Sequence, residues 1–318
     1  MKPAITHDKF FKETFSKKEE AMDLIIHVFP EEIVERLDLS TLALDNNSYI
    51  NKQLKESFSD LVYNCQYAGK SNIKIALLFE HKSKVPDYPY LQLLRYYIGA
   101  WVTNIKQKQP LVPVIPLVVY HGKEKWEHKK FEDYFPGIDH LLTRFLPRFD
   151  YLLADLSAYD DEGIARLFDQ VSVQIGLRLL KNIFHQQELK AKLHSIFQHV
   201  GTLLGSEEGA AYYLSVLLYL MENSEIDNTE LIKTINDISE KGGKIAMTTA
   251  TKLRREGRVE GRVEGRVEGR VEGKVETQKE TIITLFKMEG FSAEKISTLF
   301  NIDETFVLNT LREYGLID

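Results

Sequence analysis

Apolar residues recur at helical spacing in two separate stretches of the chain. Over residues 7–29, "HDKFFKETFSKKEEAMDLIIHVF", they fall close to a period of 3.6 residues, and Pro30 follows directly. This pattern predicts one helix that ends at the proline, because proline cannot continue a helix. The same period in "PYLQLLRYYIGAWVTNIKQK" predicts an amphipathic helix from about Tyr90 to Lys106.

Short apolar runs predict strands between and after these helices. Pieces near residues 42–44 and 48–50 precede "SDLVYNCQYAGKSNIKIALLFEHKS", which predicts a hairpin around a loop of residues 68–72. "LVPVIPLVVYHG" is typical of a buried strand, and "RFDYLLADLS" favours another. Residues 160–240 are helical in pattern throughout. The order of elements predicts an α/β core with a helical extension.

The end of the chain differs in composition from the rest. "EGRVEGRVEGRVEGRVEGKV" over residues 256–275 repeats a tetrapeptide five times, and the segment after it predicts three short helices. We therefore expect a core over residues 1–160, a helical extension over 161–250, the repeat over 251–277, and a small helix-turn-helix-like module over 278–318.

Two structures compete for the repeat. Glycine at every fourth position and like charges at i,i+4 disfavour an isolated helix, so composition alone favours a flexible linker. The glycines also form a GxxxG stripe that lets two helix backbones approach closely. We predict a helix that self-associates, and a homo-oligomer formed through residues 251–318. The last helix begins at Asp303 and Glu304 and has Arg312 as its one basic residue, so we interpret the module as assembling copies rather than reading DNA.

Bulk composition narrows the class of protein. The chain has 318 residues, 43% of them hydrophobic, and a formal net charge of −6, so no global basic field draws it to nucleic acid. Cys65 is the single cysteine, which excludes an intramolecular disulfide and a zinc ribbon. The N-terminus shows no signal-peptide pattern, and no stretch has the length of a membrane span. We expect a cytoplasmic protein without a membrane partner.

Three charged residues interrupt the predicted hairpin. With a loop over residues 68–72, Asp60 lies directly opposite Glu80, and alternation puts Lys82 on the same face. Two directly opposed carboxylates repel each other, and Mg²⁺ or another divalent cation such as Mn²⁺ between them would remove the repulsion. The competing interpretation is a strand-start cap at Asp60 and a solvent-facing pair of Glu80 and Lys82. An arbitrary match of this length more often has that plain role.

Five segments, in order, resemble one family. "HDKFFKETFS", "FSDLVY", "LLFEHKS", "LLRYYIGAW" and "PVIPLVVYHGKEKW" are similar to the recombination-promoting nucleases, or Rpn-type transposases, of the PD-(D/E)XK nuclease superfamily. The resemblance covers roughly residues 6–160, and the glycine-rich repeat and terminal helices match the family's usual ending. It implies a restriction-endonuclease-like α/β core and a metal-dependent endonuclease that cuts DNA.

The resemblance also assigns roles to particular residues. It makes Asp60 and Glu80 the metal ligands and Lys82 the motif lysine, where many members of the family are expected to carry glutamine. Gln92 lies on the following helix, where the superfamily often places a polar residue toward the site. An ordinary exposed helix glutamine is an equally good interpretation. Asp8 or Glu13 on the first helix could add a carboxylate, and Asp8 is equally typical of a helix start.

Other chemistries lack support in the sequence. No HExxH, G-x-S-x-G or Walker A pattern occurs, which leaves zinc-protease, acyl-hydrolase and P-loop functions without support. Tyr96, Tyr97 and Trp101 share one helix, where core packing is a commoner role for aromatic side chains than base stacking. We predict a Mg²⁺-dependent DNA endonuclease that promotes recombination. The alternative is a non-catalytic interaction protein that keeps the nuclease fold and assembles through its tail.

Overall fold

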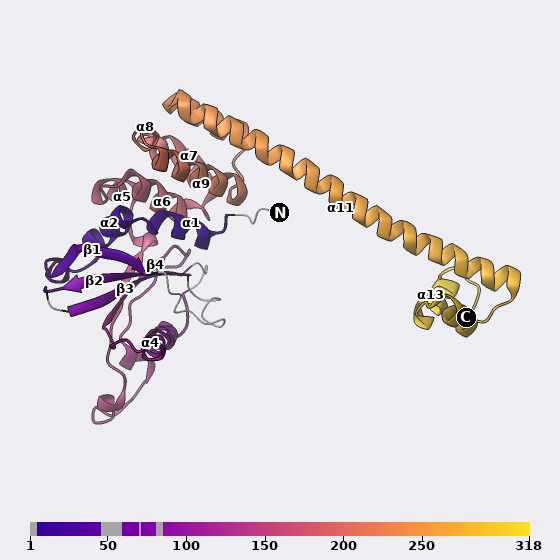
Figure 1. The fold of residues 1–318 in the computed structure, drawn as a ribbon, viewed down its shortest axis with the longest axis horizontal. Coiled ribbons are helices and arrows are strands. Elements are labelled where there is room, and N and C mark those ends of the chain that lie inside the picture. The colour runs from indigo at the N-terminus through magenta and orange to yellow at the C-terminus, as the bar shows by residue number, and fades with distance from the viewer. Residues whose placement is uncertain (1–4, 46–58, 70, 81–84) are drawn as a thin grey trace. The chain divides into compact units, whose positions relative to one another are not determined.

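The structure is a computed structural model that describes residues 5–45, 59–69, 71–80 and 85–318, with only the backbone at residues 59, 60, 79, 80, 260 and 264. The chain divides into two compact units, Lys2–Ala250 and Thr251–Asp318. Each unit is described by itself (Figure 1).

A five-stranded mixed sheet forms the centre of the first unit. Its spatial order is the order of the chain, with the first three strands antiparallel and the last three parallel. The strands are β1 (Leu37–Asp45), β2 (Ser59–Tyr67), β3 (Ser71–Glu80), β4 (Val114–Tyr120) and β5 (Leu152–Asp155). The predicted α/β core is therefore confirmed, and the expected strand at residues 48–50 lies outside the described residues.

Helices surround the sheet in the first unit. They are α1 (His7–Phe15), α2 (Lys18–Val28), α3 (Glu31–Val34), α4 (Pro89–Lys106), α5 (Asp161–Leu167), α6 (Val171–Asn182), α7 (Gln186–Phe197), α8 (Val200–Leu203), α9 (Glu207–Asn223) and α10 (Asn228–Ile238). Short 3₁₀ turns are η1 (Phe131–Tyr134), η2 (Thr143–Phe145) and η3 (Leu156–Ala158). The helix predicted from Tyr90 to Lys106 is confirmed as α4, one residue longer at its start.

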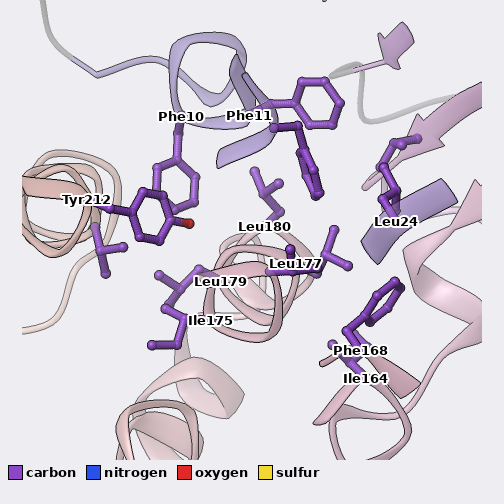
Figure 2. Packing of buried hydrophobic residues seen from close by; sticks show 14 of the residues in the cluster. Phe10, Phe11, Leu24, Ile164, Phe168, Ile175, Leu177, Leu179, Leu180 and Tyr212 are labelled. Carbon is purple, nitrogen blue, oxygen red and sulfur yellow. The ribbon is translucent and has the colours of Figure 1, made fainter. Parts of the chain in front are cut away.

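The single helix predicted over residues 7–29 is wrong, because the chain breaks into α1 and α2. Lys17 has extended backbone at φ −87° and ψ 141° and caps the start of α2. The break lets both short helices turn apolar faces to one core, with Phe10 and Phe11 from α1 and Leu24 from α2 (Figure 2). Amphipathic spacing alone does not reveal a break that preserves the apolar face.

Strand alternation divides the buried residues of the sheet between two clusters. Ile75 and Leu77 of β3 join α1, α2, α6 and α9 on one face. Ala76 and Leu78 join Leu93 and other residues of α4 on the opposite face. Figure 1 shows α4 on the far side of the sheet from α1 and α2. The helical layer of α5 to α10 thus shares its core with the sheet through α1.

The second unit contains most of a long helix, from Thr251 onward, and two short helices. The helix α11 (Glu240–Glu289) contains the whole tetrapeptide repeat, followed by α12 (Ala293–Phe300) and α13 (Glu304–Glu313). Ile282 of α11 packs with Ile296 of α12 and with Val307 and Leu311 of α13. The first of the three short helices expected after the repeat is therefore the end of α11. No described helix is long and apolar enough to cross a membrane.

Candidate functional site

The carboxyl ends of the three parallel strands meet at one edge of the sheet. Glu80, the last residue of β3, pairs with Tyr120, the last of β4, and Tyr120 pairs with Asp155, the last of β5. Ligand sites of sheets with parallel strands form outside this edge, because loops from neighbouring strands converge there. The position of Glu80 is consistent with a functional role.

The predicted register of the hairpin is wrong by two residues. Tyr67 pairs with Ser71, so the loop covers residues 68–70 only and Asp60 pairs with Leu78 instead of Glu80. The turn is tighter than expected because Ala68 and Gly69 both adopt positive φ, at 52° and 66°. Glycine adopts this conformation easily, whereas alanine rarely does, so residue types alone did not indicate the short loop.

A shift of two residues preserves the alternation of the strands. Successive residues of a strand alternate between the two faces of the sheet, and paired residues share a face. Asp60 pairs with Leu78, and Glu80 lies two residues beyond Leu78 on β3, so both positions belong to the same alternating series. Lys82 lies outside the described residues, as do residues 81–84 around it. The structure therefore brings the backbone positions of Asp60 and Glu80 together diagonally, and leaves the role of Lys82 a prediction.

Gln92 has an unusual environment for a helix glutamine. It lies in the first turns of α4, and its Oε1 atom is buried with no hydrogen-bond partner among the described residues. Buried polar atoms are nearly always paired, so an unpaired acceptor oxygen calls for a donor or a cation. The ordinary exposed glutamine that the sequence also allowed does not fit this burial.

Asp8 shows the same feature at the start of α1. Its Oδ1 atom is buried and has no partner in the described part of the chain, while Oδ2 lies 3.8 Å from Lys12 Nζ. The neighbouring His7 ring lies 5.1 Å from the ring of His121, the residue that follows β4. The start of α1 therefore lies beside the edge at which β4 ends. Glu13, the other carboxylate considered on this helix, lies more than one turn further along α1.

His7 and His121, for which no sequence pattern indicated a pairing, form a ring contact at this edge. His7 Nδ1 lies 2.6 Å from the hydroxyl of Tyr219 on α9, and His121 Nδ1 donates to the carbonyl of Leu180 on α6 at 3.2 Å. Both rings pack on Phe184. Their separation of more than a hundred residues in sequence hid the pair, and these contacts fasten the helical layer to the strand edge.

Asp155 is a carboxylate at the same edge that the sequence analysis did not single out. Its Oδ2 accepts from the backbone N–H of Trp126 at 2.8 Å, and its Oδ1 from that of Ser157 at 2.9 Å. Both oxygens thus hold the loop after β4 and the turn after β5. Asp155 is a structural residue of the edge.

A separate group has the composition of a metal site. Ligand atoms of Asp23, His27 and Asp169 lie within 4.8 Å of one another. The carboxylate of Asp23, however, accepts from the backbone N–H groups of Asp169 and Gln170 at 3.0 and 2.8 Å, in the turn that precedes α6. His27 Nδ1 lies 3.0 Å from the same carboxylate. Both carboxylate oxygens of Asp23 thus hold the turn that leads into α6, and these contacts account for the group as a structural one.

The aromatic residues of α4 pack in the core. Tyr96 and Tyr97 are buried, and the Tyr97 ring lies 5.2 Å from that of Phe149. Burial, with a smaller contribution from the charge of Asp150, raises the pKa of Tyr97 to about 12. Trp101 donates to the carbonyl of Val112 at 2.9 Å. The expectation of core packing is confirmed, and these rings are not free to stack on bases.

Comparison with known proteins identifies relatives over most of the chain. Residues 5–209 match the family described as "Putative transposase, YhgA-like". Recombination-promoting nuclease RpnC of Escherichia coli K12 is 24% identical over 254 residues, which is 79% of this chain and 81% of that protein. Recombination-promoting nuclease RpnA of the same strain is 26% identical over 79% of this chain and 84% of its own length.

One relative has a different description. The inactive recombination-promoting nuclease-like protein RpnE of Escherichia coli K12 is 26% identical over 79% of this chain and 82% of its own length. No solved structure matches the chain. The relatives therefore connect the chain to nucleases of recombination and also to a protein described as inactive.

Proposed function

The chain belongs to the YhgA-like transposase family, and on this basis we propose that it is a metal-dependent endonuclease with a PD-(D/E)XK core that cuts DNA and promotes recombination. The observation that supports this most is the strand edge: Glu80 ends β3 beside the end of β4, and Asp60 on β2 belongs to the same alternating series. Two relatives described as recombination-promoting nucleases support the same conclusion.

Asp60 and Glu80 are proposed to share one Mg²⁺. Diagonal neighbours of an antiparallel pair lie roughly 7–8 Å apart, with a somewhat shorter distance between their Cβ atoms, and two acidic side chains can reach a common ion across that distance. The unpaired buried oxygens of Gln92 and Asp8 fit the same assignment, because Mg²⁺ and its water ligands are bound by oxygen acceptors. Mn²⁺ has the same preference for oxygen and is expected to substitute.

Each residue of the proposed site has a separate role in phosphodiester hydrolysis. The bound ion supplies Lewis-acid polarisation and a more acidic water. Asp60 and Glu80 fix the place of the scissile phosphate, and Lys82 orients the attacking water or neutralises the charge that develops on the phosphate. Gln92 positions water through its amide oxygen. Asp8 is a candidate for a further carboxylate of the site.

Nicking of supercoiled plasmid tests the proposal. We expect cutting with Mg²⁺, none with EDTA, and loss of at least a hundredfold for Glu80→Ala and Asp60→Ala. Glu132→Ala on η1 is the matched control, since it removes an exposed carboxylate from the same unit. Cutting by Glu80→Ala at the wild-type rate would refute the assignment of the metal ligands.

Lys82 allows a sharper test of mechanism. Lys82→Ala is expected to lower the rate sharply while DNA affinity, measured by fluorescence anisotropy, stays within about twofold, because the ammonium acts on the transition state. Lys82→Gln is expected to keep part of the activity, as the family resemblance suggests. An unchanged cleavage rate in Lys82→Ala removes this residue from the mechanism.

The alternative proposal is a non-catalytic protein that assembles through its tail. One relative is described as inactive, and the repeat lies in the continuous helix α11, where Val259 and three more valines at four-residue spacing are 56–57% exposed. Light scattering compares the full chain with a chain that ends at Lys252. A homo-oligomer that dissociates on truncation supports assembly through residues 251–318. If the full chain and the shortened chain are both monomers, assembly through the tail is contradicted.

The proposed location of the protein is the cytoplasm.

A further inference from the structure

The connection between β4 and β5 exposes apolar side chains within residues 135–148, which are called the tip segment. Leu141 is 61% exposed, Leu142 54% and Phe145 76%. Phe145 is the most exposed large apolar side chain in the described part of the first unit. Figure 1 shows this connection extending beyond α4, away from the sheet. These side chains are therefore open to a partner.

Local hydrogen bonds hold the tip segment in an ordered shape. The carbonyl of Asp139 accepts from the backbone N–H of Leu142 at 2.9 Å, and the carbonyl of Leu142 accepts from that of Phe145 at 3.0 Å. The Asp139 carboxylate accepts from the backbone N–H of Leu141 at 2.8 Å. Because the backbone already fixes the outward position of the apolar side chains, a partner binds them at a smaller cost in conformational entropy.

Both arms of the connection pack against the start of α4. The ring of Tyr90, in the first turn of that helix, lies 5.3 Å from the ring of Phe131, which precedes the tip segment. It also lies 5.2 Å from Phe149 and 5.3 Å from Tyr151, which follow the tip segment. Gln92, whose unpaired oxygen belongs to the proposed nuclease site, follows Tyr90 by two residues. The tip segment is therefore anchored beside that site.

The proposed metal ligands belong to the face of the sheet that α4 covers. Asp60 and Glu80 are in the alternating series of Leu78. Leu78 packs in the same cluster as Tyr90. The base of the tip segment and the positions of the proposed ligands thus lie on one side of the sheet, where one bound duplex can contact both.

The charges beside Phe145 favour a polyanion. Arg144 and Arg148 are exposed, and neither has an ion-pair partner among the described residues. The guanidinium carbon of Arg144 lies 5.5 Å from the centre of the Phe145 ring. Asp139 is the one carboxylate of the tip segment, and the backbone N–H of Leu141 already occupies it. Arginines suit phosphates, and an exposed apolar side chain beside them suits insertion between bases.

We propose that the tip segment is a DNA wedge, in which Phe145 enters the base stack of a duplex while Arg144 and Arg148 contact the flanking phosphates. This inference rests on the proposed function, because DNA is the polyanion that the nuclease site would bind. It adds a residue outside that site that deforms the substrate. Insertion costs least where a base is already unpaired, so the wedge predicts a preference for such duplexes.

The fluorescence of 2-aminopurine tests insertion in EDTA, without cleavage. The probe is a duplex with one unpaired base beside a 2-aminopurine. The full wild-type chain is expected to raise its fluorescence at least twofold, and to bind it at least fivefold more tightly than the fully paired duplex, measured by anisotropy. Phe145→Ala is expected to lose both effects and Phe145→Trp to keep them. Leu214→Ala on α9, which also removes an exposed apolar side chain, is the matched control.

The salt dependence of binding tests the two arginines separately. Each phosphate contact contributes about 0.9 to the slope of log affinity against log salt concentration. The combined variant Arg144→Gln with Arg148→Gln is therefore expected to lower that slope by about 1.8. Phe145→Ala is expected to leave the slope unchanged, because it removes no charge.

The outcomes separate the wedge from the proposed function. Equal fluorescence and equal preference for the unpaired base in Phe145→Ala and wild type would overturn the wedge, while nicking that is lost in Glu80→Ala would still support the nuclease. Insertion that depends on Phe145, in a chain that nicks no plasmid, would support the wedge and contradict the nuclease. Binding to phosphatidylglycerol vesicles that depends on Phe145, with no such dependence on DNA, would overturn DNA as the partner.

Discussion

Removing the charge of Asp161 is expected to destabilise the first unit strongly. Asp161 opens α5, and its carboxylate lies 2.6 Å from Asn182 Nδ2, 2.7 Å from Lys192 Nζ and 3.7 Å from Arg178 Nε. The Arg178 side chain is only 4% exposed. Asp161→Asn therefore leaves a buried guanidinium without its counter-charge, and Asn182 without its charged acceptor.

The magnitude follows from the burial of these groups. Breaking a buried ion pair by removing one partner costs about 3–5 kcal/mol. Lys192 is partly exposed, so water screens its loss and it adds no more than about 1 kcal/mol. We expect the free energy of unfolding to fall by about 3–5 kcal/mol in Asp161→Asn. Glu188→Gln removes the exposed carboxylate that lies 3.4 Å from the same lysine, and is expected to cost below about 0.5 kcal/mol.

The pH dependence adds a second signature. Burial alone would raise the pKa of Asp161, but hydrogen bonds from Lys192 and Asn182 and the charge of Lys181 outweigh it, so the pKa lies below the usual value of 3.8. A lowered pKa means that the stabilisation is present above pH 3.8 and is lost as pH falls through the folded-state value. The difference between wild type and Asp161→Asn is therefore constant from about pH 5 to 8 and shrinks below about pH 4.

Urea unfolding followed by tryptophan fluorescence measures this loss without interference from the tail. Both tryptophans, Trp101 and Trp126, lie in the first unit. In a double-mutant cycle with Arg178→Met, the combined variant is expected to lose less than the sum of the single losses, because the second change removes the charge that the first left unpaired. A loss in Asp161→Asn as small as that in Glu188→Gln would refute the reasoning.

Three further substitutions test the scaffold. Lys74→Ala is expected to cost about 3–5 kcal/mol in urea unfolding, because Lys74 pairs with the buried carboxylate of Asp45, and Lys74→Met combined with Asp45→Leu is expected to cost less. Gly209→Ala is expected to destabilise the first unit or shift its helices, since a Cβ atom there would lie 1.9 Å from the carbonyl oxygen of Leu203. Gly261→Ala in α11 meets nothing within 4 Å and is expected to raise helix content by circular dichroism, with a gain of about 1 kcal/mol.

Strong periodicity explains which elements could be predicted. The helix that became α4 and the buried strand that became β4 are continuous apolar patterns with clear ends: α4 was predicted to within one residue, and β4 lies inside the apolar run over residues 111–122. The break between α1 and α2 was missed because Ser16 and Lys17 are ordinary helix residues. The break is determined by the core, into which α1 and α2 each turn an apolar face from a different direction.

The helix through the repeat shows how packing at both ends overrides propensity. Glycines and like charges disfavour the segment by itself, yet Ala246 near the start of α11 is buried in the first unit's core and Ile282 near its end is buried in the second. Starting a helix is its costly step, and extending one is cheap. Two packed ends thus supply the starting turns that the repeat cannot supply, while the described side chains of the repeat before Val275 remain exposed.

The candidate site was only partly predictable from the sequence. The length of the hairpin loop sets which residue of β3 pairs with Asp60, and the sequence did not indicate that length. An error of one residue would have moved Asp60 to the face opposite Glu80, whereas the actual error of two kept both in one alternating series. It changed the geometry from directly opposed to diagonal, which weakens the repulsion that first suggested an ion. The proposal of a shared ion consequently depends less on repulsion and more on the unpaired oxygens of Gln92 and Asp8, which no sequence pattern revealed.

If those oxygens contact the ion or its water ligands, Gln92→Leu and Asp8→Asn must each weaken Mg²⁺ binding measured by calorimetry. Unchanged affinity in both would leave Asp60 and Glu80 as ligands without these two residues.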